Sequence, residues 1–242
     1  MKDFAKPQSA GEAELQNLFH LMAGIWEDTE VCAKRLEETD SQFWRRTYVR
    51  TLFALIEGVT YRFKRAALAC FEDRMNRSPN SKVRYPIQLS DADNAMLREQ
   101  IFDLDNKGQS YSQTKFIPLS KNLRFAFASL ARAYEVNFAF DLNSAEWSSF
   151  QQALAIRNRL AHPKASTDLF VSDEELLNAK NTFNWFRLGL ERLFTDCMNS
   201  CYLDIEEARQ IIREEQQRKA STGDVEQIVG REPRKRKPND EP

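Results

Sequence analysis

The segment Ile156-Arg-Asn-Arg-Leu-Ala-His-Pro163 closes a predicted helix that begins at about Ser144 and ends at about Ala161. Asn158 and His162 are four residues apart, so a helix places them on one face. Proline disfavours the α conformation in the residue before it, which puts His162 where the helix ends. The C-terminal end of the helix dipole favours a protonated imidazole. With a reference pKa of about 6.5, this side chain can act as an acid or a base near neutral pH.

Arg157 is a charged residue in an apolar sector of the same helix, in one row with Phe150 and Leu154. A guanidinium in such a place is costly unless it meets a carboxylate, a phosphate or a protein interface. An internal ion pair would explain the arginine alone, and a helix cap would explain the histidine alone. Together, however, Arg157, Asn158 and His162 are what a protein needs to hold a phosphodiester and move protons around it without a metal.

Composition favours a helical protein with one sizeable core. The chain has 242 residues, of which 42% are hydrophobic and 29% are charged. Seven glycines and eight prolines are few for this length, and that balance favours helices. The formal net charge of −1 provides no overall attraction to nucleic acid, so any RNA contact must rest on local basic patches.

Nothing in the sequence indicates a membrane, a metal or a cofactor. Residues 1–14 lack the hydrophobic core of a signal peptide, and no apolar run approaches the roughly 20 residues of a membrane span. We therefore expect a cytoplasmic protein with reduced thiols. Cys197 and Cys201 are four apart, but no Cys-x-x-Cys pair or neighbouring histidine completes a zinc site. His20, the other histidine, lies beside an apolar stripe and is expected to be structural.

Apolar residues recur at helical spacing along most of the chain, which predicts an all-α fold. Asp40-Ser41 offers N-cap residues for the second helix, and Ser172–Glu175 forms a capping box at the start of the last. Arg46, Arg50 and Glu57 lie opposite the apolar side of the second helix, where a solvated face is the default expectation. The predicted helices span about residues 12–38, 43–75, 120–136, 144–161 and 172–218.

Residues 76–118 are predicted to be an insertion in this helical domain, made of loops and a short helix over about 90–102. Long insertions often carry specificity or cover a site. We expect a single helical domain over 1–218 and a disordered charged tail over 219–242. The tail contains the basic run Arg234–Lys237. A merely solvated tail is the commonest case for such a run, and the alternatives are weak affinity for RNA or a partner and a nuclear address in a eukaryotic host.

The Arg-Asn-x-x-x-His spacing resembles the signature of the HEPN superfamily, small all-α domains of which many are RNA-cleaving toxins or defence nucleases. The resemblance covers roughly Phe43 to Thr195 and includes the position of the motif just before the last long helix. A weaker likeness is the apolar run Tyr48–Glu57, which ends in a carboxylate as early helices of that family often do. The resemblance implies a HEPN-like helical bundle and marks Glu57 as a candidate supporting residue.

The resemblance also implies an activity, that of a metal-independent endoribonuclease in which two protomers pair their motifs across one cleft. Arg157 would clamp the scissile phosphate, and His162 would serve as general base or acid while the 2′-hydroxyl attacks. Asn158 would orient the imidazole or bind the phosphate. Arg159 and Lys164, expected to be exposed, would bind flanking phosphates. The expected partners are RNA, a second copy of the chain, and an antitoxin or defence-system protein.

Two other classes of function fit the same sequence. One is a catalytically silent HEPN-like adaptor in which Arg157 and His162 make a dimer or partner interface. The other is a helical nucleic-acid-binding regulator that uses the basic tail, although no helix-turn-helix signature supports it. The nuclease predicts RNA cleavage in EDTA, whereas the adaptor predicts that loss of His162 breaks the dimer.

Overall fold

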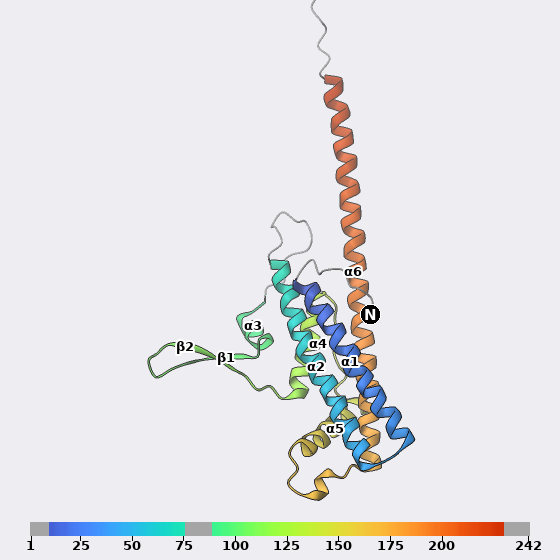
Figure 1. The fold of residues 1–242 in the computed structure, drawn as a ribbon. Coiled ribbons are helices and arrows are strands. Elements are labelled where there is room, and N and C mark those ends of the chain that lie inside the picture. Colours follow the sequence, from blue (N-terminus) through green and yellow to red (C-terminus); the bar gives the residue numbers. More distant parts are fainter. Residues whose placement is uncertain (1–9, 76–88, 230–242) are drawn as a thin grey trace, which may run out of the picture. The chain divides into compact units, whose positions relative to one another are not determined.

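Long helices make up most of the computed structural model, which describes residues 10–75 and 89–229 (Figure 1). This confirms the predicted all-α class, with one small two-stranded sheet as the exception. The long helices are α1 (Ala10–Glu38), α2 (Gln42–Met75), α4 (Leu119–Ala133), α5 (Ala145–Ala161) and α6 (Asp173–Val229), and the short ones are α3 (Asp91–Leu97) and the 3₁₀ helix η1 (Ser166–Leu169).

The chain divides into two units, Met1–Met198 and Asn199–Pro242, with the division inside α6. The predicted boundary lay further along, between residues 218 and 219. Residues 219–229, predicted to belong to a disordered tail, continue α6 as helix to Val229. Within the second unit, Arg209 pairs with Glu206, three residues earlier, at 2.7 Å, a spacing that supports an exposed helix. The basic run Arg234–Lys237 lies outside the described residues.

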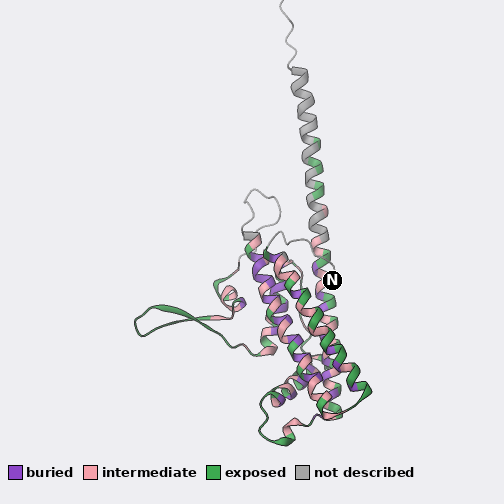
Figure 2. Ribbon diagram, in the orientation of Figure 1, coloured by how far each residue is buried: buried purple, intermediate pink, exposed green. Residues whose placement is uncertain are grey.

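In the first unit, α2 is the helix around which the others pack: α1, α4 and α5 all contact it. The three-residue connection 39–41 makes α1 and α2 antiparallel neighbours. Ser41 begins α2 as predicted, since its hydroxyl accepts the Trp44 N–H at 3.4 Å. Figure 2 shows the buried stripe that α2 presents to its neighbours. Its core side chains recur at helical spacing and are fully or almost fully buried: Tyr48, Leu52, Leu55, Ile56, Val59 and Phe63.

A cluster of aromatic rings from α2, α4, α5 and α6 forms a further part of the same core. Phe127 of α4 lies 4.7 Å from Phe63 and 6.0 Å from Phe186, measured between ring centroids. Trp185 of α6 lies 5.2 Å from Phe150 of α5. Because aromatic pairs of this kind add about 0.5–1.5 kcal/mol beyond the area they bury, the cluster holds α4, α5 and α6 in one arrangement. It thereby positions α5, which carries the Arg-Asn-x-x-x-His motif.

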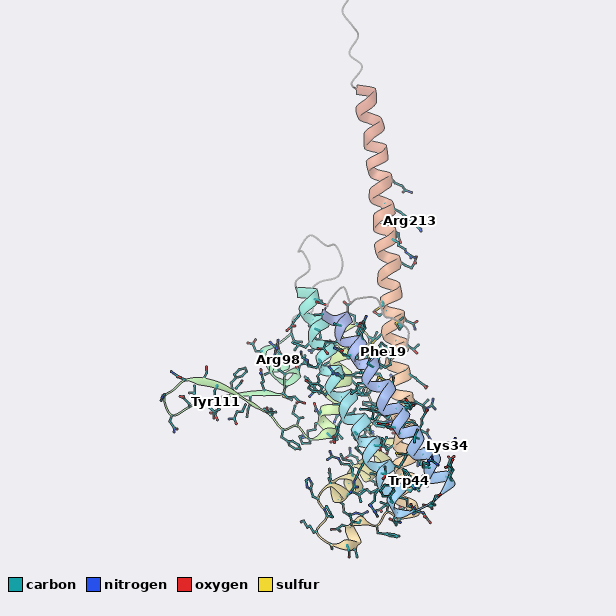
Figure 3. The ribbon with its side chains drawn as sticks, viewed as in Figure 1. Phe19, Lys34, Trp44, Arg98, Tyr111 and Arg213 are labelled. Carbon is teal, nitrogen blue, oxygen red and sulfur yellow. The ribbon has the colours of Figure 1, made fainter. Side chains whose placement is uncertain are left out.

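The insertion contains a β-hairpin that the sequence analysis missed. α3 begins at Ser90 as expected, because the Ser90 hydroxyl accepts the Asp93 N–H at 3.0 Å. The helix ends at Leu97, however, so the prediction that it continues to Phe102 is wrong. Instead β1 (Gln100–Leu104) pairs antiparallel with β2 (Ser110–Thr114), which carries Tyr111 (Figure 3).

Two residues with positive φ explain the hairpin. Glu99 has a φ of 55°, which stops α3 and redirects the chain into β1. Gly108 has a φ of 74° in the turn, where its N–H donates to the Asp105 carbonyl at 3.0 Å. The Asp105 carboxylate accepts the N–H groups of Lys107 and Gln109, each at 2.8 Å. The Asp-Asn-Lys-Gly sequence therefore carried a turn signal between two strand-forming runs.

The base of the hairpin is attached to α2 through a buried charge. Lys64 of α2 is 0% exposed and forms an ion pair with the Glu99 carboxylate. The Glu99 carbonyl also accepts the Lys115 N–H at 2.7 Å. This bond joins the residue before β1 to the residue after β2. A second tie joins α3 to α2, because Arg98, labelled in Figure 3, donates to Glu72 at 2.6 Å. The insertion is therefore held at one end by two ion pairs to α2 and by a third to α4, in which Arg132 contacts Asp93 at 2.9 Å.

Candidate active site

The helix α5 begins and ends where the sequence predicts. Ser144 is its N-cap, with the hydroxyl accepting the Trp147 N–H at 3.1 Å. At the other end the His162 N–H donates to the Asn158 carbonyl at 3.2 Å, and His162 itself leaves the helical conformation with φ −132° and ψ 61°. The buried residues of α5 are Phe150, Ala153, Ile156 and Leu160. Asn158 and His162 are exposed on a different face, so the motif lies at the protein surface.

Arg157 contacts a carboxylate, which is one of the three partners that the sequence predicts for a guanidinium in an apolar row. Its guanidinium forms an ion pair with Glu57, which lies on α2 one hundred residues away in sequence. A second N–H group donates to the Asn158 side-chain oxygen at 3.1 Å. The Arg157 side chain remains 31% exposed and that of Glu57 40% exposed. The pair is thus open to solvent, and the structure brings together three residues that the sequence analysis assigned to one site.

His162 and Lys164 are both exposed. Within the part of the chain that the structure describes, neither side chain has a hydrogen-bond partner. The chain turns directly after them, because the Asp168 carboxylate accepts the backbone N–H groups of Lys164 at 2.7 Å and Ala165 at 2.9 Å. These two N–H groups hold the pKa of Asp168 below its usual range. Asp168 therefore fixes the backbone of the turn that contains the exposed Lys164.

Arg159 is placed differently from the expectation that it is exposed and available to RNA. It is half-buried, donates to the Phe170 carbonyl at 2.8 Å and forms an ion pair with Glu175 at 2.9 Å. Glu175 also accepts the Ser172 N–H at 3.0 Å while its own N–H donates to the Ser172 hydroxyl at 3.2 Å, which confirms the predicted capping box. Arg159 thus joins the end of α5 to the start of α6 through its Nη2 group, which bonds both partners, while its Nε–H is buried without a hydrogen-bond partner among the described residues.

Arginines of α2 hold the same region, and the sequence analysis missed their role. Arg46 donates to the Leu169 carbonyl at 3.1 Å, and Arg50 donates to the Leu160 carbonyl at 3.2 Å. The expectation of a merely solvated face is therefore wrong for Arg46 and incomplete for Arg50, which stays exposed. Arg50 thus donates to a carbonyl in the last turn of α5, where carbonyl groups have no hydrogen-bond partner within the helix.

A third arginine of α2 fastens the start of α6. Arg45 donates to the Val171 carbonyl at 3.0 Å and pairs with Asp40 and with Asp173. The hydrogen bond from Arg45 holds the pKa of Asp40 below its usual range. Gln42 bonds both the N–H and the carbonyl of Val171, at 2.8 and 3.0 Å. No pattern near Val171 could have indicated these contacts, because the partners lie more than a hundred residues away.

The end of α5 carries a partly exposed guanidinium and an exposed imidazole. The guanidinium of Arg157 has five N–H donors, of which one bonds Glu57 and one bonds Asn158. Across residues 10–75 and 89–229, no group of three or more His, Cys, Asp and Glu side chains could hold a metal ion. None of the helices that the structure describes has both the length and the apolar character needed to cross a membrane.

No protein-family model matches the chain, and comparison with curated proteins and with solved structures found no match.

Proposed function

We propose that the chain is a metal-independent endoribonuclease of the HEPN type and that it acts as a homodimer. One observation carries the proposal: the Arg-Asn-x-x-x-His residues lie at the exposed end of α5, with Arg157 oriented by Glu57 and His162 unbound within the described residues. The helices of the first unit then form a HEPN-like bundle with the hairpin segment as its insertion. A role as a toxin or antiphage effector fits an enzyme that cleaves RNA.

The proposed reaction is an in-line attack within the RNA itself. The His162 imidazole takes the proton from a 2′-hydroxyl, and that oxygen forms a bond to the adjacent phosphorus. The phosphorus–O5′ bond breaks, and the leaving oxygen takes a proton from an imidazolium. The products are a 2′,3′-cyclic phosphate and a 5′-hydroxyl, and no co-reactant is consumed. Proton transfer of this kind contributes about 10²–10⁴-fold to the rate.

Arg157 would stabilise the charge that develops on the phosphate oxygens. A donor of this kind is worth about 10²–10³-fold in rate. Glu57 acts as a positioning residue, since its carboxylate fixes the plane of the guanidinium and leaves other N–H groups for the phosphate. Lys164 would contact a neighbouring phosphate. We do not assign this role to Arg159, because its Nη2 group already bonds Glu175 and the Phe170 carbonyl.

A second copy of the chain supplies what one copy lacks. The reaction needs a base for the 2′-hydroxyl and an acid for the leaving oxygen, whereas each motif contains a single histidine. A two-fold axis beside the exposed end of α5 places a second imidazole across the same phosphodiester. The chain should therefore be a dimer in solution when it cleaves.

The test is cleavage of RNA by the purified chain in EDTA, at several pH values between about 5 and 8. We expect 2′,3′-cyclic phosphate ends from the wild type and a loss of about 10²-fold or more for His162→Ala. His20→Gln, which changes the other histidine, is the matched control and should cleave normally. RNA that stays intact over the whole pH range, or equal loss in both variants, would contradict the proposal.

The runner-up function is a catalytically silent adaptor, and the internal contacts of the motif favour it. Arg157 already has a carboxylate partner, and Arg159 ties α5 to α6, as residues of a purely structural joint would. Growth on expression together with oligomeric state separates the two functions. If His162→Ala relieves growth arrest and the dimer persists, the nuclease is supported. If the same change breaks the dimer, the adaptor is supported.

A further inference from the structure

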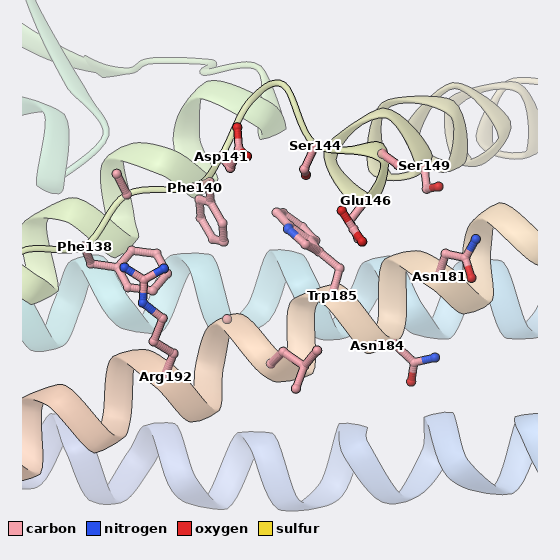
Figure 4. A pocket seen from close by; sticks show the side chains of 14 residues that line it. Phe138, Phe140, Asp141, Ser144, Glu146, Ser149, Asn181, Asn184, Trp185 and Arg192 are labelled. Carbon is pink, nitrogen blue, oxygen red and sulfur yellow. The ribbon is translucent and has the colours of Figure 1, made fainter.

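A cavity of about 550 Å³ lies at the opposite end of α5 from the motif. Its walls come from the connection between α4 and α5, the first turns of α5 and the N-terminal third of α6 (Figure 4). The size is within the range of about 300–1,000 Å³ that is usual for small-molecule sites. Along α5, Glu146 in the cavity and Arg157 in the motif are eleven residues apart, or about 16 Å. The cavity is therefore a separate site.

Aromatic rings form the floor of this cavity. The rings of Phe140 and Trp185 lie 4.8 Å apart between centroids, and both are half-buried. Phe140 can lie against α6 because residue 189 is glycine: a Cβ there would be 3.2 Å from the ring. A glycine inside a helix costs about 1 kcal/mol relative to alanine, so its presence is explained by the close approach of the ring. The result is an apolar floor that is open to solvent on one side.

The two ends of the cavity carry opposite chemistry. At one end the Arg192 guanidinium lies over the Phe138 ring, 4.9 Å from its centroid. At the other end lie Glu146 and Asn181, with Trp185 between the two ends (Figure 4). Among the described residues, none of these polar side chains has a hydrogen bond or ion pair within the protein. A carboxylate, an amide and a guanidinium are thus all available to a ligand.

We propose that this cavity binds a guanine nucleotide, either free or as a guanosine of single-stranded RNA. The Watson–Crick edge of guanine carries two adjacent donors, N1–H and N2–H, which one carboxylate such as that of Glu146 accepts together. The Asn181 amide bonds the base beside them, the ring system lies on the aromatic floor, and Arg192 binds the phosphate. Asn181 and Arg192 are eleven residues apart on α6, about 16 Å, which a nucleotide spans with two side chains reaching toward it.

The charges of the cavity argue against simpler ligands. A plain anion would meet Glu146 and Asp141, and a plain cation would meet Arg192. A ligand with donors at one end, a flat ring in the middle and an anion at the other end satisfies all three regions. Adenine does not, because its Watson–Crick edge presents the N1 acceptor where guanine presents a donor. The binding does not require that His162 cleaves RNA.

The experiment is titration of the purified full chain with GMP, followed by calorimetry and by tryptophan fluorescence. We expect saturable binding, with AMP at least tenfold weaker. Glu146→Gln and Asn181→Ala should each weaken GMP about tenfold or more, and Trp185→Phe should remove most of the fluorescence change. Arg192→Gln should weaken GMP but leave guanosine unchanged, since guanosine lacks the phosphate. Glu174→Gln and Arg124→Gln, exposed residues of α6 and α4 outside the cavity, are the matched controls.

Short single-stranded RNAs with and without one guanosine identify the source of the ligand. Tight binding of GMP assigns the site to a free nucleotide. If the guanosine-containing RNA binds and GMP does not, the site is assigned to RNA recognition. Either result supports the guanine site. No heat and no fluorescence change with both ligands, equal affinities for GMP and AMP, or an unchanged affinity in both Glu146→Gln and Asn181→Ala would overturn it.

Discussion

Glu57 of α2 and Arg157 of α5 form an ion pair at the exposed end of α5, although one hundred residues separate them in the sequence. Because both side chains keep 31–40% of their surface in contact with solvent, the pair adds little to stability. Its effect is on direction: the carboxylate sets where the guanidinium points. The relationship is therefore a matter of positioning more than of folding.

Glu57→Gln is the first test of this positioning role. The substitution keeps the shape of the side chain and removes the charge that orients Arg157. We expect RNA cleavage to fall roughly 10- to 100-fold, while the free energy of unfolding changes by less than about 1 kcal/mol. Glu191→Gln is the matched control, since Glu191 also pairs with an arginine, Arg187, at 2.7 Å on an exposed surface. Equal cleavage by both variants would rule out the positioning role.

Substitutions of Lys164 and Arg159 should have different effects: the first on RNA binding, the second on stability. Lys164→Ala should weaken RNA binding for all sequences and reduce the slope of log affinity against log salt by about 1. Arg159→Ala should leave that slope unchanged and cost about 1–2 kcal/mol of stability, because it removes the bonds to Glu175 and the Phe170 carbonyl. The measurements are RNA affinity at several salt concentrations and urea unfolding. The opposite assignment of the two effects would restore the role in RNA binding that the sequence suggests for Arg159.

The Lys64–Glu99 pair should respond unequally to loss of either partner. Glu99→Gln leaves a fully buried ammonium without its counter-charge and should destabilise by about 3 kcal/mol or more. Lys64→Met removes the buried charge, keeps an unbranched stem and leaves Glu99 in contact with water, so it should cost less. Urea unfolding measures both. Glu72→Gln, which breaks the exposed pair with Arg98, serves as the control and should cost under about 1 kcal/mol. Equal losses for Glu99→Gln and Lys64→Met would contradict this account.

Two helical glycines should respond differently to alanine. Gly24 of α1 has open space where a Cβ would lie, so Gly24→Ala should stabilise by about 0.5–1 kcal/mol. At Gly189 the added Cβ would come within 3.2 Å of the Phe140 ring, which is packed against Trp185. Gly189→Ala should therefore gain less or lose stability, and tryptophan fluorescence should change. Thermal unfolding of the two variants is the comparison, and equal stabilisation would show that the ring moves freely.

The turn after His162 should weaken in acid. The pKa of Asp168 is lowered in the folded chain by the N–H groups of Lys164 and Ala165. Its contribution is therefore complete above the unfolded pKa of about 3.9 and is lost as the pH falls through the lower folded pKa. As the pH falls from about 4 to below the folded pKa of Asp168, Asp168→Asn should lose less stability than the wild type. Parallel urea midpoints for the two proteins over that range would contradict it.

Local patterns were enough to predict α5 and its ends, the start of α3 and the capping box of α6. Ser144, Ser90 and Ser172 each bond an N–H group three residues away, so the whole contact is contained in a few neighbouring letters. The same holds for the apolar spacing that predicts the all-α class. The hairpin was missed although Asp105 and Gly108 carried a local turn signal, because the sequence did not show that α3 stops before Glu99, which has a left-handed backbone and pairs with Lys64 of α2.

The partners of the charged side chains came only from the folded chain. Periodicity shows that Arg157 lies in an apolar row, but the packing of α5 against α2 is what brings Glu57 to it. In the same way, the position of Arg159 in the sequence predicts an exposed side chain. Only the packing of the start of α6 beside α5 brings Glu175 to it. A helix and its caps are set by neighbours along the chain, whereas an ion pair between helices requires that both are packed. Whether an arginine binds a ligand or the protein itself is therefore settled at the tertiary level.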